Sequence, residues 1–89
     1  MPKNKHRLVV VDWVDSAGND GGWLSMSDIL EVRPAHCRSV GWIIDETDDY
    51  LHLLPHRGLP DNQGKEQGFG NILIPKRCID HIRKIPEKR

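Results

Sequence analysis

Apolar and polar residues alternate in short runs along the chain, and the clearest runs lie in its middle. Residues 40–44 and 50–54 are rich in β-branched, aromatic and leucine side chains, and an acidic turn separates them. Such side chains favour a pleated surface, and Pro55 ends the second run because proline cannot donate to a strand ladder. The pattern therefore predicts a hairpin whose first strand starts near His36 or Cys37.

A second alternating run, Arg7 to Val14, predicts the first strand of the chain. Side chains along a strand point to opposite faces in turn, so Val9, Val11 and Trp13 share one face. We expect these three to point inward, because the opposite choice would bury Asp12.

The segment after the first strand predicts a turn followed by at most one short helix. Residues 15–22 are rich in glycine and small polar side chains, which is the strongest turn signal in the chain. Ser25 and Asp28 have the spacing of a helix start, in which a hydroxyl caps the first turn. Because Pro34 closes the segment, we predict a helix no longer than residues 27–32, with an irregular loop or a short strand as alternatives.

The second half of the chain predicts one long loop and two further strands. Residues 56–70 are polar and rich in glycine, which indicates a mobile loop. Residues 71–75 predict a short strand closed by proline. The three isoleucines that follow at intervals of three suit either a short helix or a turn that leads into a strand. We favour one 3₁₀ turn over residues 75–78 and a terminal strand over residues 79–85.

These elements predict one mostly β domain over residues 7–85, between a loose basic extension (residues 1–6) and a solvated tail (residues 86–89). Five strands would form a single, strongly bent sheet, with Gly41 marking a bulge or a close backbone approach. We expect the terminal strand to pair with the first strand and so close the sheet. The three tryptophans are expected to be the main core anchors.

Charge and apolar content limit the classes of partner. Thirteen basic and thirteen acidic residues cancel, which argues against a strong nonspecific grip on nucleic acid or on an anionic membrane. The longest apolar run, Leu8 to Val11, is far too short to span a bilayer, and no signal peptide is recognisable. We therefore expect a cytoplasmic protein, without a membrane partner, whose Cys37 and Cys78 are free thiols.

No motif in the sequence predicts a cofactor. His36 or Cys37 could bind zinc together with Cys78 and His81, but paired cysteines on tight knuckles are absent. A nucleophilic cysteine beside a histidine would need a pocket that a small barrel rarely offers. The acidic residues 45–49 lack the order of a calcium loop and fit a solvated hairpin turn. Buried thiols and surface imidazoles are the simpler interpretation, and no catalytic residue is predicted.

Two groups of basic residues suggest a nucleic-acid surface. They would meet if the first and last strands pair, and aromatic side chains beside them could stack on single-stranded bases. The alternative is that the aromatic residues are core and the charges keep the surface soluble. The candidate binding residues are Lys5, Arg7, Lys76, Arg77, Arg83 and Lys84, with Trp13, Trp23, Tyr50 or Phe69 as candidate stacking residues.

Four brief motifs resemble a group of short bacteriophage-encoded proteins of unknown function. They are residues 11–16, 22–23, 38–43 and 74–79, in the order VDWVDS, GW, RSVGWI and IPKRCI. This resemblance implies an accessory protein inside the infected bacterium, and it implies no chemistry.

Residues 39–45 and 73–82 are also distantly similar in layout to Sm-like barrels. Sm-like barrels resemble SH3-like barrels, and they bind RNA as rings. The resemblance implies a small, closed or half-closed barrel. The chain departs from the Sm-like pattern because it lacks the helix before the first strand and the expected Asn-Gly turn. We therefore transfer the topology alone and none of the RNA-binding residues.

The sequence thus predicts a non-enzymatic bacteriophage accessory protein that binds a host or phage macromolecule. A single-stranded RNA- or DNA-binding small barrel is the first alternative, and a metal- or cysteine-dependent enzyme is the second. If the two terminal strands do not close on each other, their free edges would pair between copies and give a homo-oligomer.

Overall fold

A computed structural model of the chain describes residues 6–19 and 21–87. The predicted extension at residues 1–5 and the last two residues of the predicted tail lie outside these ranges. Within them the elements follow the order β1 (Arg7–Asp15), α1 (Met26–Leu30), β2 (Ala35–Glu46), β3 (Tyr50–Leu54), β4 (His56–Gly58), β5 (Gln67–Phe69), β6 (Ile72–Pro75), the 3₁₀ turn η1 (Lys76–Cys78) and β7 (Ile79–Lys84).

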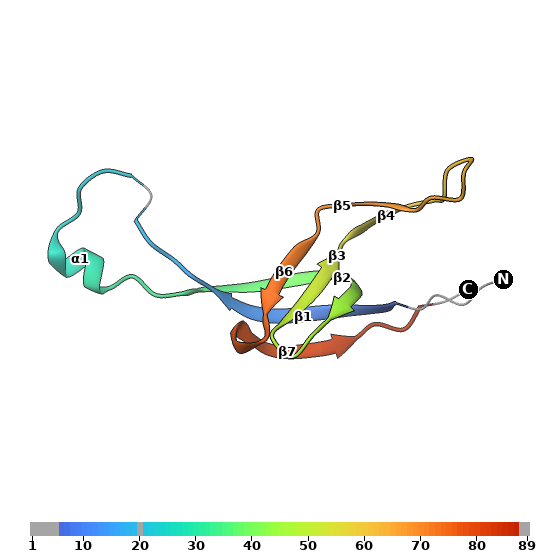
Figure 1. Cartoon of the computed structure of the whole chain (residues 1–89). Helices are drawn as coiled ribbons and strands as arrows, with labels where there is room; N and C mark the ends of the chain where they lie inside the picture. The colour runs from blue at the N-terminus through green and yellow to red at the C-terminus, as the bar shows by residue number, and fades with distance from the viewer. Residues whose placement is uncertain (1–5, 20, 88–89) are drawn as a thin grey trace.

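Five of the strands form one antiparallel sheet in the order β6-β3-β2-β1-β7 (Figure 1). The sheet is strongly bent, and its ladder shifts register between Asp12 and Trp13 and between Ile43 and Asp45. The prediction of a mostly β fold with one short helix is confirmed. The 3₁₀ turn and the pairing of the last strand with the first are confirmed as well.

The sheet does not close into a barrel, and in this respect the prediction is wrong. Strand β7 pairs with β1, while β6 pairs only with β3, so β6 and β7 remain the two edges. β6 is four residues long and ends at Pro75. Proline has no N–H to donate to a further strand, and a short strand offers few hydrogen bonds for closure.

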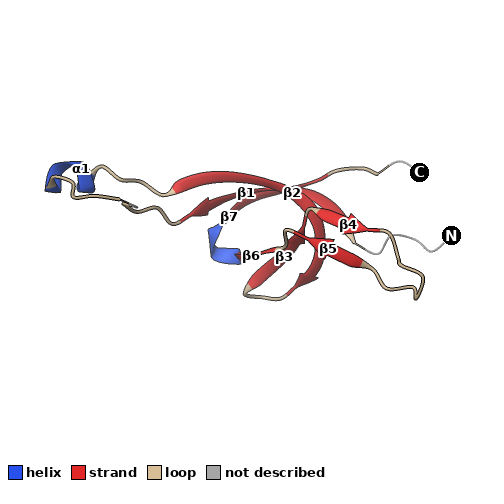
Figure 2. Ribbon diagram, turned by 90° about the horizontal axis from the view of Figure 1, so that it is seen from above, coloured by secondary structure: helices blue, strands red, loops and turns tan. Residues whose placement is uncertain are grey.

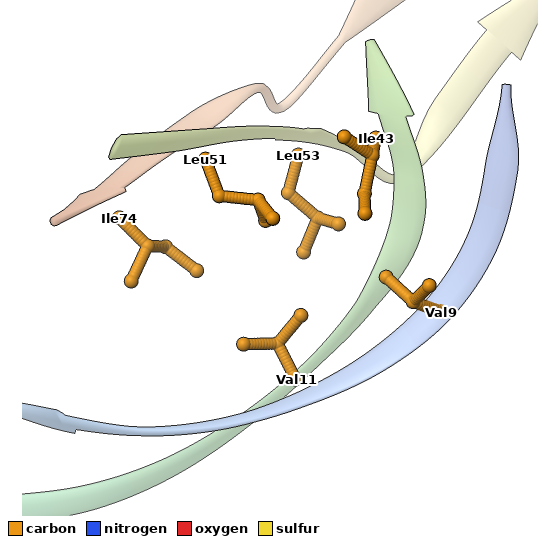
Figure 3. Packing of buried hydrophobic residues seen from close by; sticks show 6 residues of the cluster. All are labelled: Val9, Val11, Ile43, Leu51, Leu53 and Ile74. Atoms are coloured by element: carbon orange, nitrogen blue, oxygen red, sulfur yellow. The ribbon is translucent and has the colours of Figure 1, made fainter. Parts of the chain in front are cut away.

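Six aliphatic side chains inside the bend form the core, as Figure 3 shows. They come from β1, β2, β3 and β6, and none is more than 7% exposed: Val9, Val11, Ile43, Leu51, Leu53 and Ile74. Burial of each such side chain stabilises the fold by about 1.5–3 kcal/mol. The predicted inward face of the first strand is confirmed, with Trp13 packed against the edge of this cluster.

The prediction that the tryptophans anchor the core is wrong. Trp23 is 101% exposed, and Trp42 is half-buried with the Arg57 guanidinium 5.1 Å from the centre of its ring. Trp13 Nε1 donates a hydrogen bond to Ser39 Oγ at 3.0 Å. Aliphatic residues fill the bend, Trp13 packs against them at the edge, and Trp23 lies outside the core.

Gly41 sits where two strands approach closely, as the sequence predicted. A Cβ atom at this position would lie 2.8 Å from the carbonyl oxygen of Leu54 and 2.9 Å from its carbonyl carbon. Because both atoms belong to the backbone, only glycine allows β2 and β3 to approach this closely here.

The predicted mobile loop 56–70 is instead a small hairpin, in which β4 and β5 form a separate two-stranded sheet. Two local features order it. The Asp61 carboxylate accepts from the backbone N–H groups of Gln63 and Lys65, which fixes the turn. The Leu54 side chain also packs so closely on Gly68 that a Cβ there would lie 2.7 Å from Leu54 Cδ2.

The molecule is elongated, measuring 59 × 27 × 24 Å along its principal axes. Its radius of gyration is 17.4 Å, whereas a compact chain of this length has a radius of about 12 Å. The helix α1 and the β4–β5 hairpin project from opposite ends of the sheet, as Figures 1 and 2 show. We call residues 16–34 the arm and the remaining described residues the body.

Candidate functional site

The arm is the connection between the first two strands, and it stands away from the body. Asp15 and Ala35 are the last paired residues of β1 and β2, so the arm extends a two-stranded ribbon beyond the sheet (Figure 2). Every described residue of the arm is exposed. The helix at its far end has no buried residue.

Six of the exposed side chains in the arm are large and apolar. Their exposed fractions run from 39% to 101%, for Trp23, Leu24, Met26, Ile29, Leu30 and Val32. Soluble monomers rarely expose a contiguous apolar patch of this kind, and such patches mark interaction sites. The arm is therefore the strongest candidate site in the part of the chain that the structure describes.

Local hydrogen bonds shape the arm. Asn19 Nδ2 donates to the carbonyl of Gly22, where a φ of 71° favours glycine. Ser25 Oγ accepts from the backbone N–H of Asp28 and caps α1, which confirms the predicted helix start. The helix ends one turn later, when the Glu31 N–H donates to the carbonyl of Asp28. A five-residue helix is not stable by itself in water, so contact with another surface would stabilise it.

The arm carries more acidic than basic residues. Its charged residues are Asp20, Asp28, Glu31 and Arg33, which give one positive and three negative charges. Because the whole chain has thirteen of each sign, the remainder carries twelve basic and ten acidic residues. The body itself, residues 6–15 and 35–87, carries eight basic and ten acidic residues, and the four further cations of the sequence are at positions 3, 5, 88 and 89, outside the described residues.

The outer face of the sheet, opposite the core, combines apolar and basic side chains. The register places Arg83 and Val40 on either side of Val10. Leu8 lies opposite Trp42 on the same face, and Val40 is 49% exposed. These residues of β7, β1 and β2 form what we call the outer patch: Leu8, Val10, Val40, Trp42 and Arg83.

An ion pair borders the outer patch. Arg38 Nε lies 2.6 Å from Asp12 Oδ1, and the hydrogen bond that Arg38 donates lowers the pKa of the Asp12 carboxyl below its usual value. Arg83 lowers the same pKa further through its positive charge, and His81 acts in the same direction. The charge of Asp12 is therefore offset by Arg38, and the same face also carries the Glu87 carboxylate, which accepts a hydrogen bond from Trp42 Nε1 at 3.1 Å.

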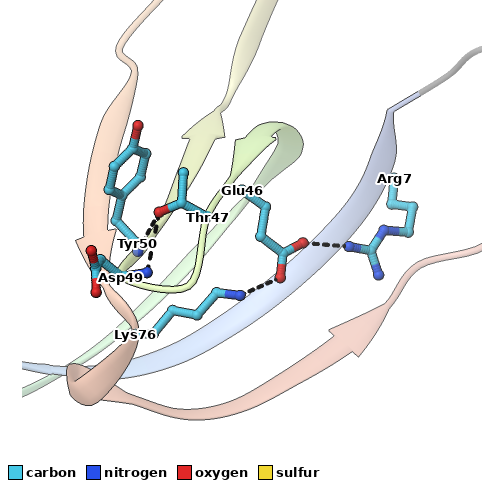
Figure 4. A network of polar contacts seen from close by, with 6 residues as sticks. All are labelled: Arg7, Glu46, Thr47, Asp49, Tyr50 and Lys76. Carbon is cyan, nitrogen blue, oxygen red and sulfur yellow. Dashed lines mark hydrogen bonds and ion pairs between the residues drawn. The ribbon is translucent and has the colours of Figure 1, made fainter.

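A second ion-pair network holds two of the predicted nucleic-acid residues. Glu46 binds Arg7 at 3.0 Å and Lys76 at 2.6 Å, as Figure 4 shows. The hydrogen bond from Lys76 lowers the pKa of Glu46 below its ordinary value. The adjoining turn is fixed by Thr47 Oγ1, which accepts from the backbone N–H groups of Asp49 and Tyr50. The network ties β1, β2 and η1 together, and it neutralises part of the charge of both cations.

The other predicted nucleic-acid residues are spread over the body. Arg77 lies in η1, and Lys5 lies outside the described residues. Arg83 and Lys84 are opposite Val10 and Val9, so these two neighbours point to opposite faces of the sheet. The first and last strands do pair, but the described cations do not share one face.

The candidate stacking residues are equally dispersed. Trp13 is at the edge of the core, and Trp23 is on the acidic arm. Tyr50 is half-buried on β3, and Phe69 is 76% exposed on β5, where its ring centre lies 6.0 Å from that of His56.

The cysteines are free thiols, as predicted. Cys37 lies opposite Trp13 on β2, Cys78 ends η1, and His81 lies opposite Asp12 on β7. Among residues 6–19 and 21–87 no three side chains of His, Cys, Asp or Glu are grouped to hold a metal ion, so the alternative zinc set is not assembled. His36 and Cys37 instead line a hollow of about 320 Å³, which also touches Asp12, Trp13, Arg38 and Asp80.

Comparisons of the chain with models of known families, with curated proteins and with solved structures give no match. No described helix has the length and apolar character needed to cross a membrane.

The sequence did not predict the arm as a site. Its tryptophan and aliphatic residues are of the types that usually form a hydrophobic core, so residue type alone assigns them to the core. A signal was present. Nineteen residues separate the paired strand ends, far more than a hairpin turn needs, and the helix described among them is too short to bury an apolar face.

Proposed function

We propose that the chain is a non-enzymatic accessory module that binds another protein, and that the arm is its binding element. The observation that carries this proposal is the exposure of the arm's apolar side chains, with Trp23 fully in water and Leu30 69% exposed. Tryptophan and flanking aliphatic residues are the side chains that dominate binding energies at protein interfaces.

Burial of this surface could supply a useful affinity. Each large apolar side chain transferred out of water contributes about 1.5–3 kcal/mol, and part of that gain is lost to the entropy of ordering. A short helix with apolar residues at positions i, i+3 and i+4, here Met26, Ile29 and Leu30, suits docking into a groove. The arm therefore has the form of a segment that inserts into a groove of its partner.

The charge of the arm favours a protein over a nucleic acid as its partner. Asp28 and Glu31 flank the apolar side chains and would repel phosphates. The same carboxylates would pair with a basic rim around an apolar surface. If the chain is a phage accessory protein, as the sequence resemblance implies, we expect this partner to be a phage or host protein.

The test compares two double variants as immobilised baits. Trp23→Ser with Leu30→Ser removes apolar surface from the arm, and Leu59→Ser with Phe69→Ser removes equally exposed apolar surface from the β4–β5 region. We expect purified candidate partners, or the chain itself, to bind the wild type and the second variant and to bind the arm variant at least about tenfold more weakly.

Two results would contradict the proposal. Equal binding by both variants would show that the arm is not the binding element. Nucleic acid that co-purifies with the protein, leaves at high salt and is unaffected by the arm variant would favour the nucleic-acid alternative.

A further inference from the structure

We propose that Met26 makes binding by the arm sensitive to oxidation. Conversion of its thioether to the sulfoxide weakens the contact with the partner protein, and a bound partner shields the sulfur from oxidants. The inference rests on the proposed function and adds a form of regulation to the same site. Two observations carry it: Met26 is 69% exposed, and it is the first residue of α1.

Met26 belongs to the apolar side of α1. Residues three and four positions apart lie on one face of a helix, so Met26 shares a face with Ile29 and Leu30. These two side chains are 42% and 69% exposed. A partner groove that takes up Ile29 and Leu30 therefore covers Met26 as well.

The chemistry of methionine sets Met26 apart from the other large apolar residues of the arm, because it alone among them contains sulfur. With hydrogen peroxide as the oxidant, the O–O bond breaks, one oxygen atom bonds to the sulfur and the other leaves as water. The sulfur loses two electrons and the peroxide gains them. The thioether packs as an apolar group, whereas the sulfoxide is polar. Placing that oxygen in an apolar groove without a hydrogen-bond donor is unfavourable.

The other described sulfur atoms lie outside the arm and are less accessible. Cys37 on β2 and Cys78 in η1 are half-buried free thiols. Thiols oxidised to sulfenic acids or disulfides return to thiols under a thiol reductant, whereas methionine sulfoxide is reversed by methionine sulfoxide reductases. Oxidation of the cysteines can therefore be separated from oxidation of Met26 after one treatment.

Binding and oxidation oppose each other at this sulfur. A small oxidant can reach the exposed side chain of Met26, and a docked partner would cover it. A partner that binds the thioether form more tightly than the sulfoxide form also disfavours oxidation by the same factor. The bound arm should therefore be the protected form and the free arm the sensitive one.

The test treats the full-length chain with hydrogen peroxide and then with a thiol reductant. Binding is measured to purified candidate partners whose binding depends on Trp23 and Leu30. We expect one added oxygen atom in the peptide that contains Met26, and binding at least about fivefold weaker than that of the untreated chain. Methionine sulfoxide reductases should restore both the mass and the binding.

Met26→Leu is the matched control. Leucine has a similar volume, forms helices well and has no sulfur to oxidise, so the variant should bind like the wild type before and after the treatment. It keeps Met1, Cys37 and Cys78, so any effect of oxidation at these residues would persist in it. With the partner in excess, sulfoxide formation at Met26 of the wild type should fall as the bound fraction rises.

An oxidised wild type that still binds like the untreated chain would overturn this inference alone and leave the proposed function standing. A loss of binding that Met26→Leu shows equally would overturn it too, because the loss would then arise at another residue. Binding that does not depend on Trp23 and Leu30 would overturn the proposed function, and this inference with it.

Discussion

The body and the arm both contain apolar residues, but they bury them to opposite extents. Leu51 is completely inaccessible between the two halves of the bent sheet, whereas Leu30 is 69% exposed on α1. Val11 in the body is likewise inaccessible, and Trp23 in the arm is fully exposed. The same residue types therefore serve two purposes: in the body they hold the fold together, and in the arm they are available to a partner.

Within one short chain, the apolar residues of the body contribute to the free energy of folding, and those of the arm are available to contribute to the free energy of binding. The body has a small aliphatic core inside a sheet that leaves two edges open. The arm adds surface without adding core. Changes in the body should alter the free energy of unfolding, and changes in the arm should alter association.

The largest effect should come from Leu51→Ala. Truncating a fully buried leucine leaves a cavity and costs about 2–5 kcal/mol, a large fraction of the stability of a domain this small. Leu30→Ala is the matched change in the arm and should alter the stability by no more than about 0.5 kcal/mol. Chemical denaturation at low protein concentration would measure both values. Equal losses would show that the arm belongs to the folded core.

A smaller effect is expected at a glycine. Gly41→Ala forces a Cβ against the backbone of Leu54 and should destabilise the body by about 1–3 kcal/mol. Gly18→Ala in the arm meets nothing within 4 Å and should be neutral or slightly stabilising. Thermal melts of the two variants measure the difference. If Gly41→Ala melts at the wild-type temperature, β2 and β3 do not approach as closely as described.

The smallest effect concerns the ion pairs of Glu46. Because Glu46 is partly exposed, Glu46→Gln should cost only about 0.5–1 kcal/mol at neutral pH. Glu31→Gln in the arm makes the same chemical change and should leave the stability of the body unchanged. Equal effects of the two substitutions would show that the network around Glu46 does not stabilise the body.

The Glu46 pair also predicts a pH dependence. Its pKa is lower in the folded chain than the ordinary value of 4.5, so the folded state binds a proton there more weakly than the unfolded state does. The contribution of Glu46 is therefore complete above pH 4.5 and is lost as the pH falls through the lower, folded pKa. Denaturation between pH 3 and 7 should show this loss in the wild type and a smaller one in Glu46→Gln.

Local patterns predicted most of the body. Alternation placed Val9 and Val11 inside, and the serine at position 25 was correctly identified as a helix cap. The steric demand at Gly41 was also foreseen. Each of these features depends on residues that are close together in the sequence, so residue type and spacing are enough to predict it.

Three features could not be predicted because they depend on distant geometry. Whether the sheet closes depends on where β6 and β7 lie in space. The order in residues 56–70 comes from Leu54 packing on Gly68, a contact outside the predicted loop. The exposure of Trp23 depends on the arm leaving the sheet, and residue type alone favours burial of tryptophan.

The most direct test of the division between body and arm is to remove the arm. Asp15 and Ala35 are paired across the ribbon, so Asn-Gly in place of residues 16–34 would join them in a tight hairpin turn. A thermal melt of this shortened chain and its binding to partner proteins should be measured beside those of the wild type. Our account predicts a cooperative melt and at least about tenfold weaker binding. Loss of the cooperative melt, or binding equal to that of the wild type, would contradict it.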